Sequence, residues 1–159
     1  MNNTGTLKVA TRGTRGIVIT REFDAARRRV FDAWTKPDVL RHWFGPRGWS
    51  LVVCEVDLKV GGAWRFVVRR ANGTEIGMSG VYREIVRPER FVHTQTFDLE
   101  DFPGELLVTT DLVEDRGRTT LTSTILYPSQ ELRDGDVNPT EHGATESYAK
   151  LDEYLASTA

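Results

Sequence analysis

The fold is decided by residues 51–86, which read LVVCEVDLKVGGAWRFVVRRANGTEIGMSGVYREIV. From Leu51 onward, apolar residues recur at alternate positions and turn residues interrupt them at short intervals, which is typical of an antiparallel meander. Gly61-Gly62 and Asn72-Gly73 are hairpin turns, because these residues adopt a positive φ at little cost. The segment therefore predicts three successive strands at residues 51–59, 63–70 and 75–86.

The strand pattern extends on both sides of this segment. Upstream, residues 17–23 (IVITREF) are rich in β-branched and aromatic residues, which predicts a first strand. Downstream, turn residues and a connection at 99–104 separate three more predicted strands, at residues 90–97, 105–114 and 118–127. The chain is therefore predicted to contain seven strands.

Two short helices are predicted between the first strand and the meander. Asp24 is suited to cap the first helix. Its apolar face is formed by Val30, Phe31 and Trp34. Pro37 ends this helix, because the residue before a proline is displaced from the α region, and it opens a second helix at the first helical position. The second helix carries Leu40, Trp43 and Phe44 and stops at Gly45-Pro46.

A long amphipathic helix is predicted at the C-terminal end. Asn138 caps it, Pro139 takes its first position, and Glu141 completes a box-like cap. One face of the helix is apolar and consists of Ala144, Tyr148, Leu151 and Leu155. Such a face must be buried, so we expect this helix to cover the sheet.

Together these elements predict an α+β protein. Its seven-stranded antiparallel sheet is curved, two short helices follow the first strand, and the long C-terminal helix packs across the sheet. Gly77 and Gly80 lie inside a strand, where a large sheet bends most easily. The expected shape is a half-open grip that the last helix closes.

Composition sets the limits on function. The chain has 159 residues, of which 39% are hydrophobic and 28% charged, as expected for one globular domain. The net charge of -2 argues against nucleic acid as a partner. No apolar run approaches the length of a membrane span, and the polar residues 1–16 resemble no signal peptide, so we expect a cytoplasmic location. We expect residues 1–16 to be a partly flexible extension and residues 17–157 to form a single domain.

Several stretches resemble the START-like (SRPBCC, helix-grip) superfamily. Within it the chain is similar to the proteins related to the C-terminal domain of the heat-shock-protein-90 ATPase activator. The likeness runs in order from about Ile17 to Leu155. The stretches that carry it are residues 23–25 (FDA), 31–35 (FDAWT), 43–48 (WFGPRG), 61–66 (GGAWRF), 80–85 (GVYREI), 88–90 (PER) and 127–129 (YPS).

The resemblance implies a START-like domain with a hollow between the sheet and the terminal helix. Lipid carriers, hormone receptors, cyclases and co-chaperones all use this scaffold, so the fold alone does not decide the function. It leaves three interpretations open: a domain that binds a small apolar molecule, a chaperone-associated stress-response protein with a protein partner, or a cyclase- or hydratase-type enzyme.

Candidate chemical groups are few. The spacing of His42, His93 and His142 matches no metal motif, and the single cysteine, Cys54, has the strand parity of a core residue. His93 shares its strand face with two phenylalanines, which favours a hydrogen-bonded core histidine over a ligand or catalytic group. Glu84 has the parity of an inward residue, but a bulge would turn it to solvent or an arginine would pair with it. Without catalytic, metal or cofactor motifs, we expect a binding domain rather than an enzyme.

Aromatic residues provide the best candidate site. Trp64 and Phe66 alternate on one strand, and other aromatic residues cluster near the short second helix. In a helix-grip scaffold such positions line a pocket, and pockets are mainly apolar with a few polar groups. The residues that we expect to contact a small apolar ligand are Trp43, Phe44, Trp49, Trp64, Phe66, Met78, Tyr82, His93, Gln95 and Tyr148.

Overall fold

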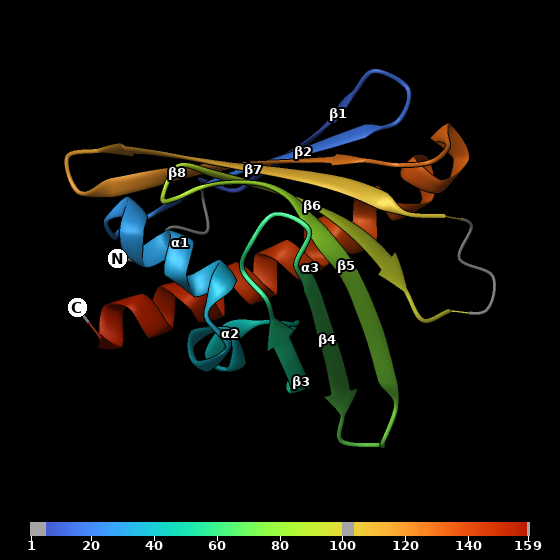
Figure 1. Cartoon of the computed structure of the whole chain (residues 1–159), viewed down its shortest axis with the longest axis horizontal. Helices are drawn as coiled ribbons and strands as arrows, with labels where there is room; N and C mark the ends of the chain where they lie inside the picture. The colour runs from blue at the N-terminus through green and yellow to red at the C-terminus, as the bar shows by residue number, and fades with distance from the viewer. Residues whose placement is uncertain (1–5, 100–103, 159) are drawn as a thin grey trace.

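The computed structural model describes residues 6–99 and 104–158 (Figure 1). In these residues the order of elements is β1 (Lys8–Arg12), β2 (Gly16–Phe23), α1 (Arg27–Thr35), α2 (Pro37–Trp43), β3 (Trp49–Val56), β4 (Ala63–Arg70), β5 (Glu75–Val86), β6 (Arg90–Phe97), β7 (Leu106–Asp115), β8 (Arg118–Leu126) and α3 (Gln130–Ser157). The strands form one antiparallel sheet in the order β1-β2-β8-β7-β6-β5-β4-β3. The predicted α+β class and the antiparallel sheet with a long C-terminal helix are confirmed.

The sheet has eight strands, so the prediction of seven was wrong by one. The additional strand, β1, pairs with β2 and lies at the edge of the sheet. Most of its side chains are exposed, so it has no alternation of apolar residues to reveal it in the sequence. It falls within residues 1–16, of which residues 1–5 lie outside the described part. The connection expected at 99–104 lies mostly outside it as well.

Helix α1 starts later than predicted. Its N-cap residue is Ala26 and not Asp24, and the side chain of Ala26 makes no hydrogen bond to the first turn of the helix. Instead, the backbone N–H of Arg27 donates to Oε1 of Glu114 on β7, at 2.7 Å. This acceptor lies far away in the sequence, which is why local cap rules missed it. The predictions that Pro37 ends this helix and opens the next are confirmed, because α1 stops at Thr35 and α2 starts at Pro37.

Helix α3 begins earlier than predicted, at Gln130 instead of near Asn138. The side chain of Ser129 caps it by accepting a hydrogen bond from the backbone N–H of Leu132, at 3.2 Å. Pro139 therefore lies inside the helix, where it lacks the N–H that would bond to the carbonyl of Gly135. Tertiary packing overrides this local break, because both halves of the helix are held on the sheet.

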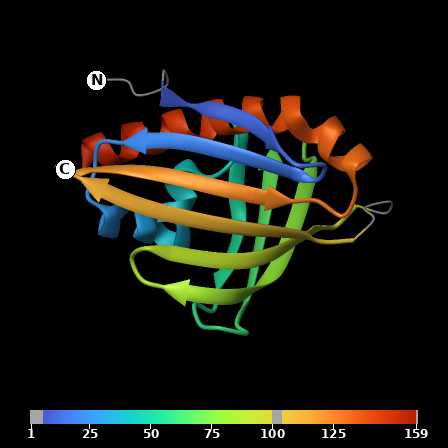
Figure 2. The same ribbon diagram turned by 90° about the horizontal axis from the view of Figure 1, so that it is seen from above.

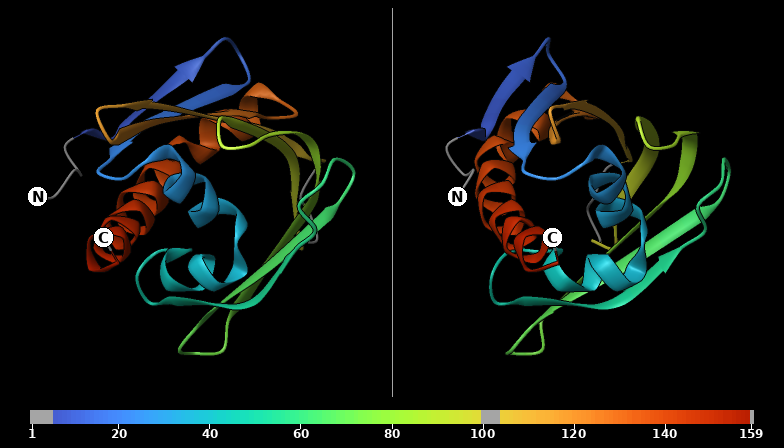
Figure 3. Two further views of the ribbon diagram at one scale, coloured as in Figure 1. Left: turned by 60° about the vertical axis from the view of Figure 1, so that its left-hand side comes forward. Right: turned by 90° about the vertical axis from the view of Figure 1, so that its left-hand side faces the viewer.

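Both ends of α3 are anchored by buried arginines. In the N-terminal part, Arg133 donates to the backbone oxygens of Gly13 and Gly16, at 3.3 and 2.8 Å. Towards the C-terminus, Arg21 of β2 donates to both carboxylate oxygens of Asp152, at 2.6 and 3.3 Å. Figures 2 and 3 show α3 lying along the side of the sheet that also faces α1 and α2. The three helices thus share the concave side of the sheet.

The backbone of β6 passes very close to Gly80 of β5. A Cβ atom at this position would lie 1.8 Å from the backbone oxygen of Thr94, so only glycine fits. The close approach lets the indole N–H of Trp64 donate to the same oxygen, at 3.1 Å. Figure 3 shows that the sheet is curved and that β4 and β5 turn towards the helices; that Gly77 and Gly80 allow this bend remains a prediction.

Candidate binding site

A hollow lies between the concave face of the sheet and α3. It consists of an inner cavity of about 160 Å³ and an outer groove of about 460 Å³. The two parts adjoin, because six residues line both of them: Ile19, Trp34, Phe44, Met78, Gln95 and Tyr148. The inner cavity and the outer groove therefore share part of their walls, and the groove opens towards solvent.

The walls of the inner cavity are mostly aromatic and aliphatic. Its remaining lining residues come from α2 and from strands β4 to β8, and they are Leu40, Trp64, Phe66, Tyr82, Phe91, His93, Val108, Thr110, Ser123 and Ile125. The rings of Trp64 and Phe66 are 4.8 Å apart, and the ring of Phe44 is 5.0 Å from that of Phe66. These contacts hold the aromatic walls in place.

The outer groove lies between the middle of α3 and the segment 44–49. Apart from Tyr148, the residues on its α3 side are small, namely Pro139, Thr140, Gly143, Ala144 and Ser147. Opposite them lie residues of the 44–49 segment and of the β4 and β5 strands, including Gly45, Pro46, Trp49, Val68 and Ile76. The groove is open because its helical wall is built from small residues.

Polar contacts tie the 44–49 segment to α3 at the mouth of the groove. Nζ of Lys150 donates to the backbone oxygen of Gly45, at 3.1 Å. The backbone N–H of Arg47 donates to Glu146, at 3.1 Å, and the Arg47 side chain forms an ion pair with Glu153. Burial is the main reason why the pKa of Lys150 lies below its usual value. At the mouth, Arg47 therefore pairs with Glu153, and Lys150 bonds to a backbone oxygen.

Each residue predicted to contact a ligand lines the hollow. Trp64, Phe66, Tyr82 and His93 line the inner cavity, Trp43 and Trp49 line the outer groove, and Phe44, Met78, Gln95 and Tyr148 line both. Trp43 has a second role, because it is almost fully buried and its indole N–H donates to the Ala33 backbone oxygen at 3.0 Å. The structure thus brings these residues together. That they contact a ligand remains a prediction.

Two polar residues of the inner cavity were missed. Thr110 of β7 and Ser123 of β8 are buried, and their hydroxyl groups lie 3.5 Å apart on paired positions of the two strands. Each stands at an inward position between apolar neighbours, such as Val108 and Leu112 on β7. A polar residue on an otherwise apolar strand face is the signal that would have found them.

His93 is the most unusual group in the inner cavity. Its ring stacks on Phe91 at 5.9 Å and meets the edge of Trp64 at 5.3 Å. Burial lowers the pKa of His93 to about 4, and a hydrogen bond with Gln95 offsets part of that effect. Nδ1 is buried and has no hydrogen-bond partner within the described part of the chain. The prediction of a hydrogen-bonded core histidine is therefore wrong for this atom.

Two tyrosines also contribute polar groups to the hollow. Burial raises the pKa of Tyr148 to about 12 and raises that of Tyr82 even further. Tyr148 also contacts three aromatic rings, with centroid distances of 5.6 Å to Trp34, 5.7 Å to Phe23 and 6.2 Å to Trp43. Both phenols are therefore neutral at physiological pH.

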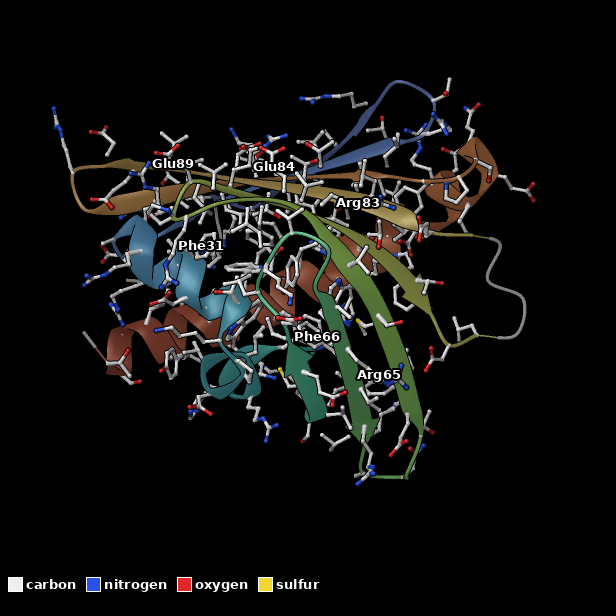
Figure 4. All side chains as sticks on the ribbon, viewed as in Figure 1. Phe31, Arg65, Phe66, Arg83, Glu84 and Glu89 are labelled. Carbon is white, nitrogen blue, oxygen red and sulfur yellow. The ribbon has the colours of Figure 1, made fainter. Side chains whose placement is uncertain are left out.

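Glu84 lies outside the hollow, so it cannot act together with His93. The β5–β6 register shifts between Tyr82 and Glu84, and the Glu84 carboxylate accepts from Nε of Arg90 at 3.0 Å. Figure 4 shows Glu84 on the side of the sheet away from the helices, whereas Phe66 lies on the helix side. The predicted bulge and the predicted arginine partner are both confirmed. Among residues 6–99 and 104–158, no carboxylate lines the hollow.

The other candidate groups lie at the surface or in the core. His42 is exposed beside the ring of Tyr154, at 4.7 Å, and His142 is exposed beside Glu146. Cys54 is buried, which raises the pKa of its thiol to about 11, as expected for a core cysteine. Within the described residues, no group of three or more His, Cys, Asp or Glu side chains is placed to hold a metal ion. No helix in these residues is long and apolar enough to span a membrane.

Comparison with known proteins gives a consistent result. A solved structure from Rhodobacter sphaeroides is 27% identical, with a TM-score of 0.89, and the match covers 96% of this chain and 99% of that chain. One from Chromobacterium violaceum is 26% identical, with a TM-score of 0.80 and coverages of 89% and 97%. A Silicibacter pomeroyi protein called AHSA1 is 22% identical, with a TM-score of 0.76 and coverages of 91% and 99%, and this likeness shows the fold alone. The chain matches no curated protein.

The family assignment comes from the sequence itself. Residues 24–156 match the family described as Activator of Hsp90 ATPase homolog 1-like protein. This range extends from the residues before α1 almost to the end of α3, so it includes nearly every element around the hollow. The chain therefore belongs to the Activator of Hsp90 ATPase homolog 1-like family and has the START-like helix-grip fold.

Proposed function

We propose that this protein binds a small, mainly apolar molecule in the hollow between the sheet and α3. The observation that carries the proposal is the lining of the hollow, which is aromatic and aliphatic with a few polar groups and an opening to solvent. Binding sites for small molecules have this composition. The proposed contacts are the ten residues predicted from the sequence, together with Trp34.

The size of the inner cavity supports a role in binding. At about 160 Å³ it has far more room than one water molecule needs, and a bound apolar molecule would make contacts across it.

Met78 provides the test, because it lines both parts of the hollow. In a close-packed core, Met78→Trp would cost about 1–3 kcal/mol or more, whereas in a hollow the ring fills space at little cost. We expect the parent protein to bind members of a panel of neutral apolar compounds, with a change in tryptophan emission. Met78→Trp should remain folded and bind none of them.

Ser79→Trp is the matched control, because residue 79 is next to Met78 on β5 but borders a surface on the other face of the sheet. It should leave binding unchanged. Absence of binding by the parent, together with strong destabilisation of Met78→Trp, would mean that the core is solid. That result would refute the proposal.

A second candidate function is recognition of a protein partner, with a role in the stress response in the cytoplasm. The family name points to a chaperone, and one surface feature favours such a role. Leu107 of β7 and Leu126 of β8 are 38% and 39% exposed and lie directly opposite each other. Contiguous exposed apolar patches mark interaction surfaces, and we infer that these two leucines are part of one. We would test whether the parent protein stimulates a chaperone ATPase and whether Leu107→Asp does not. Stimulation by the parent alone would support this candidate. No stimulation by the parent would contradict a chaperone as the partner.

A further inference from the structure

In the described part of the chain, the walls of the hollow carry no ionised side chain. Among the described residues that line the inner cavity and the outer groove, none is Asp, Glu, Lys or Arg. The titratable residues in these walls are His93, Tyr82 and Tyr148. Burial lowers the pKa of His93 to about 4 and raises the pKa values of both tyrosines, so all three are neutral. At neutral pH the described walls are therefore uncharged.

A buried cation lies beside the hollow, but it already has a counter-ion. Arg21 of β2 is buried, and its charge partly offsets the effect of burial on the pKa of Tyr148. The guanidinium of Arg21 donates to both carboxylate oxygens of Asp152, at 2.6 and 3.3 Å. A ligand carboxylate could pair with Arg21 only by displacing Asp152, which would leave that side chain without its partner. Arg21 is therefore not available to a ligand.

The charged residues at the mouth of the groove balance one another. The pKa of Lys150 is lowered mainly by burial and further by Arg47, whereas Glu153 and Glu146 act in the opposite direction, so these four charges form one cluster. Two positive and two negative side chains give the cluster no net charge. Lys150 also donates to the backbone oxygen of Gly45, at 3.1 Å. A ligand ion at the mouth would therefore meet no excess of opposite charge.

The polar groups of the inner cavity suit a neutral oxygen and not an ion. The hydroxyl groups of Thr110 and Ser123 lie 3.5 Å apart and bond to each other. The amide nitrogen of Gln95 has the sulfur of Met78 as an acceptor at 3.9 Å, and a thioether is a weak acceptor. Hydroxyl and amide groups can bond to the oxygen of a ketone, ester or alcohol, but they carry no charge that would neutralise an ion.

The cost of dehydration therefore decides which molecules enter the hollow. An ion that leaves water for an apolar site without a partner loses far more free energy than a neutral polar group does. Aromatic rings such as those of Trp64 and Phe66 attract cations, but this attraction is smaller than the cost of burying an unpaired ion. A neutral molecule of the same shape avoids that cost.

We propose that the hollow selects neutral molecules and excludes organic anions and cations of the same size and shape. The ligand is then an apolar compound whose polar groups are uncharged, such as a ketone, ester or alcohol, and not a fatty acid or an amine. This inference rests on the proposed function, since it names the class of molecule that occupies the same hollow. Because an anion is excluded for want of a counter-ion, a cation placed in the wall should admit it.

Three compounds of one shape test the inference by calorimetric titration at neutral pH: 4-butylacetophenone, 4-butylbenzoate and 4-butylbenzamidine. Their planar end groups have the same number of non-hydrogen atoms, but the first compound is neutral, the second is an anion and the third is a cation. A cavity of about 150 Å³ in another protein holds benzene, so the inner cavity, at about 160 Å³, has room for their ring. The ketone should bind at least about tenfold more tightly than either ion.

Gln95→Lys tests the cause of this selectivity, because residue 95 lines both parts of the hollow. The new ammonium group supplies the missing counter-ion, so the variant should bind the benzoate at least about tenfold more tightly than the parent does and should still exclude the benzamidine. Thr96→Lys is the matched control. It adds the same charge at the next position of β6, where Thr96 pairs with Ser79 and Ser79 borders the other face of the sheet. It should leave the preference for the ketone unchanged.

Two results would overturn the inference. The first is binding of the benzoate or the benzamidine to the parent as tightly as the ketone. The second is a folded Gln95→Lys variant that gains no affinity for the benzoate, because a missing counter-ion would then not be the cause. If Gln95→Lys does not fold, the comparison of the three compounds on the parent decides.

The outcomes also separate the inference from the proposed function. Binding of all three compounds to the parent with similar affinity, and of none to Met78→Trp, would leave the proposed function intact and the inference wrong. If none of the three binds but the neutral probe N-phenyl-1-naphthylamine binds to the parent and not to Met78→Trp, the inference is again wrong and the proposed function stands. If that probe does not bind either, both are wrong.

Discussion

Asp152→Ala tests how α3 is held on the sheet. Arg21 is 1% exposed, and its guanidinium donates two hydrogen bonds to Asp152, at 2.6 and 3.3 Å. Without the carboxylate, the cation keeps only a backbone oxygen of Glu22 and the face of Phe23 as partners. Removing one member of a buried ion pair leaves an uncompensated charge, and we expect a loss of about 3–5 kcal/mol.

Two further variants isolate the cause of that loss. Replacing both partners, by Arg21→Met together with Asp152→Leu, removes the unpaired charge and should bring stability to within about 1 kcal/mol of the parent. Glu153→Ala is the matched control, because it removes the exposed ion pair with Arg47 from the next position of the same helix. It should cost about 0–1 kcal/mol.

Unfolding in urea, followed by circular dichroism, measures all of these variants. The midpoint should fall for Asp152→Ala with an unchanged slope, which would show that stability and not compactness changes. A loss for Asp152→Ala no larger than that for Glu153→Ala would refute the argument, because Arg21 would then reach solvent on its own. If the double variant is as unstable as Asp152→Ala, that result would also refute the argument. The loss would then come from poorer packing between α3 and β2 and not from the unpaired charge of Arg21.

Leu151→Ala should cost about 2–5 kcal/mol in the same urea assay, because Leu151 is fully buried between helix and sheet; a negligible loss would contradict its burial. Gly80→Ala should distort the sheet strongly, because its Cβ would lie 1.8 Å from the oxygen of Thr94, whereas Gly135→Ala has free space and should stabilise α3 by about 1 kcal/mol. Backbone amide spectra should show widespread shifts for Gly80→Ala and few shifts for Gly135→Ala. Burial lowers the pKa of His93 from 6.5 to about 4, so the contribution of His93 to stability is present above pH 6.5 and is lost as the pH falls towards 4. Between pH 6.5 and pH 4, the urea midpoint of the parent should therefore fall more steeply than the urea midpoint of His93→Gln.

Local sequence patterns predicted the strands in which buried and exposed residues alternate. They failed for elements whose ends depend on a residue far away in the sequence. The strands at 63–70, 75–86 and 90–97 match the prediction because alternating burial and glycine turns determine them. The start of α1 depends on Glu114, far along the chain, and β1 has too few buried residues to give a signal. The start of α3 was assigned to Asn138 because Pro139 obeys a local rule that packing of the whole helix overrides.

The candidate site shows the same division. Strand parity placed Trp64, Phe66 and His93 correctly on the concave face, since parity needs only the strand itself. Parity failed at Glu84, where the bulge after Tyr82 reverses the direction of the side chain. The missing partner of the His93 Nδ1 atom could not be predicted, because it depends on the side chains of several strands at once.

Stability and binding are located in different parts of α3, and this explains why the hollow persists. Towards the C-terminus, Leu151 and Leu155 fill the space against the sheet, and Asp152 neutralises the buried arginine. About two to three turns earlier, small residues such as Gly143 and Ala144 face the outer groove and leave it open. Larger side chains there would pack better but would close the route to the inner cavity. Met78→Trp should therefore abolish binding at little cost in stability, whereas Leu151→Ala should lower stability and leave the lining of the hollow unchanged.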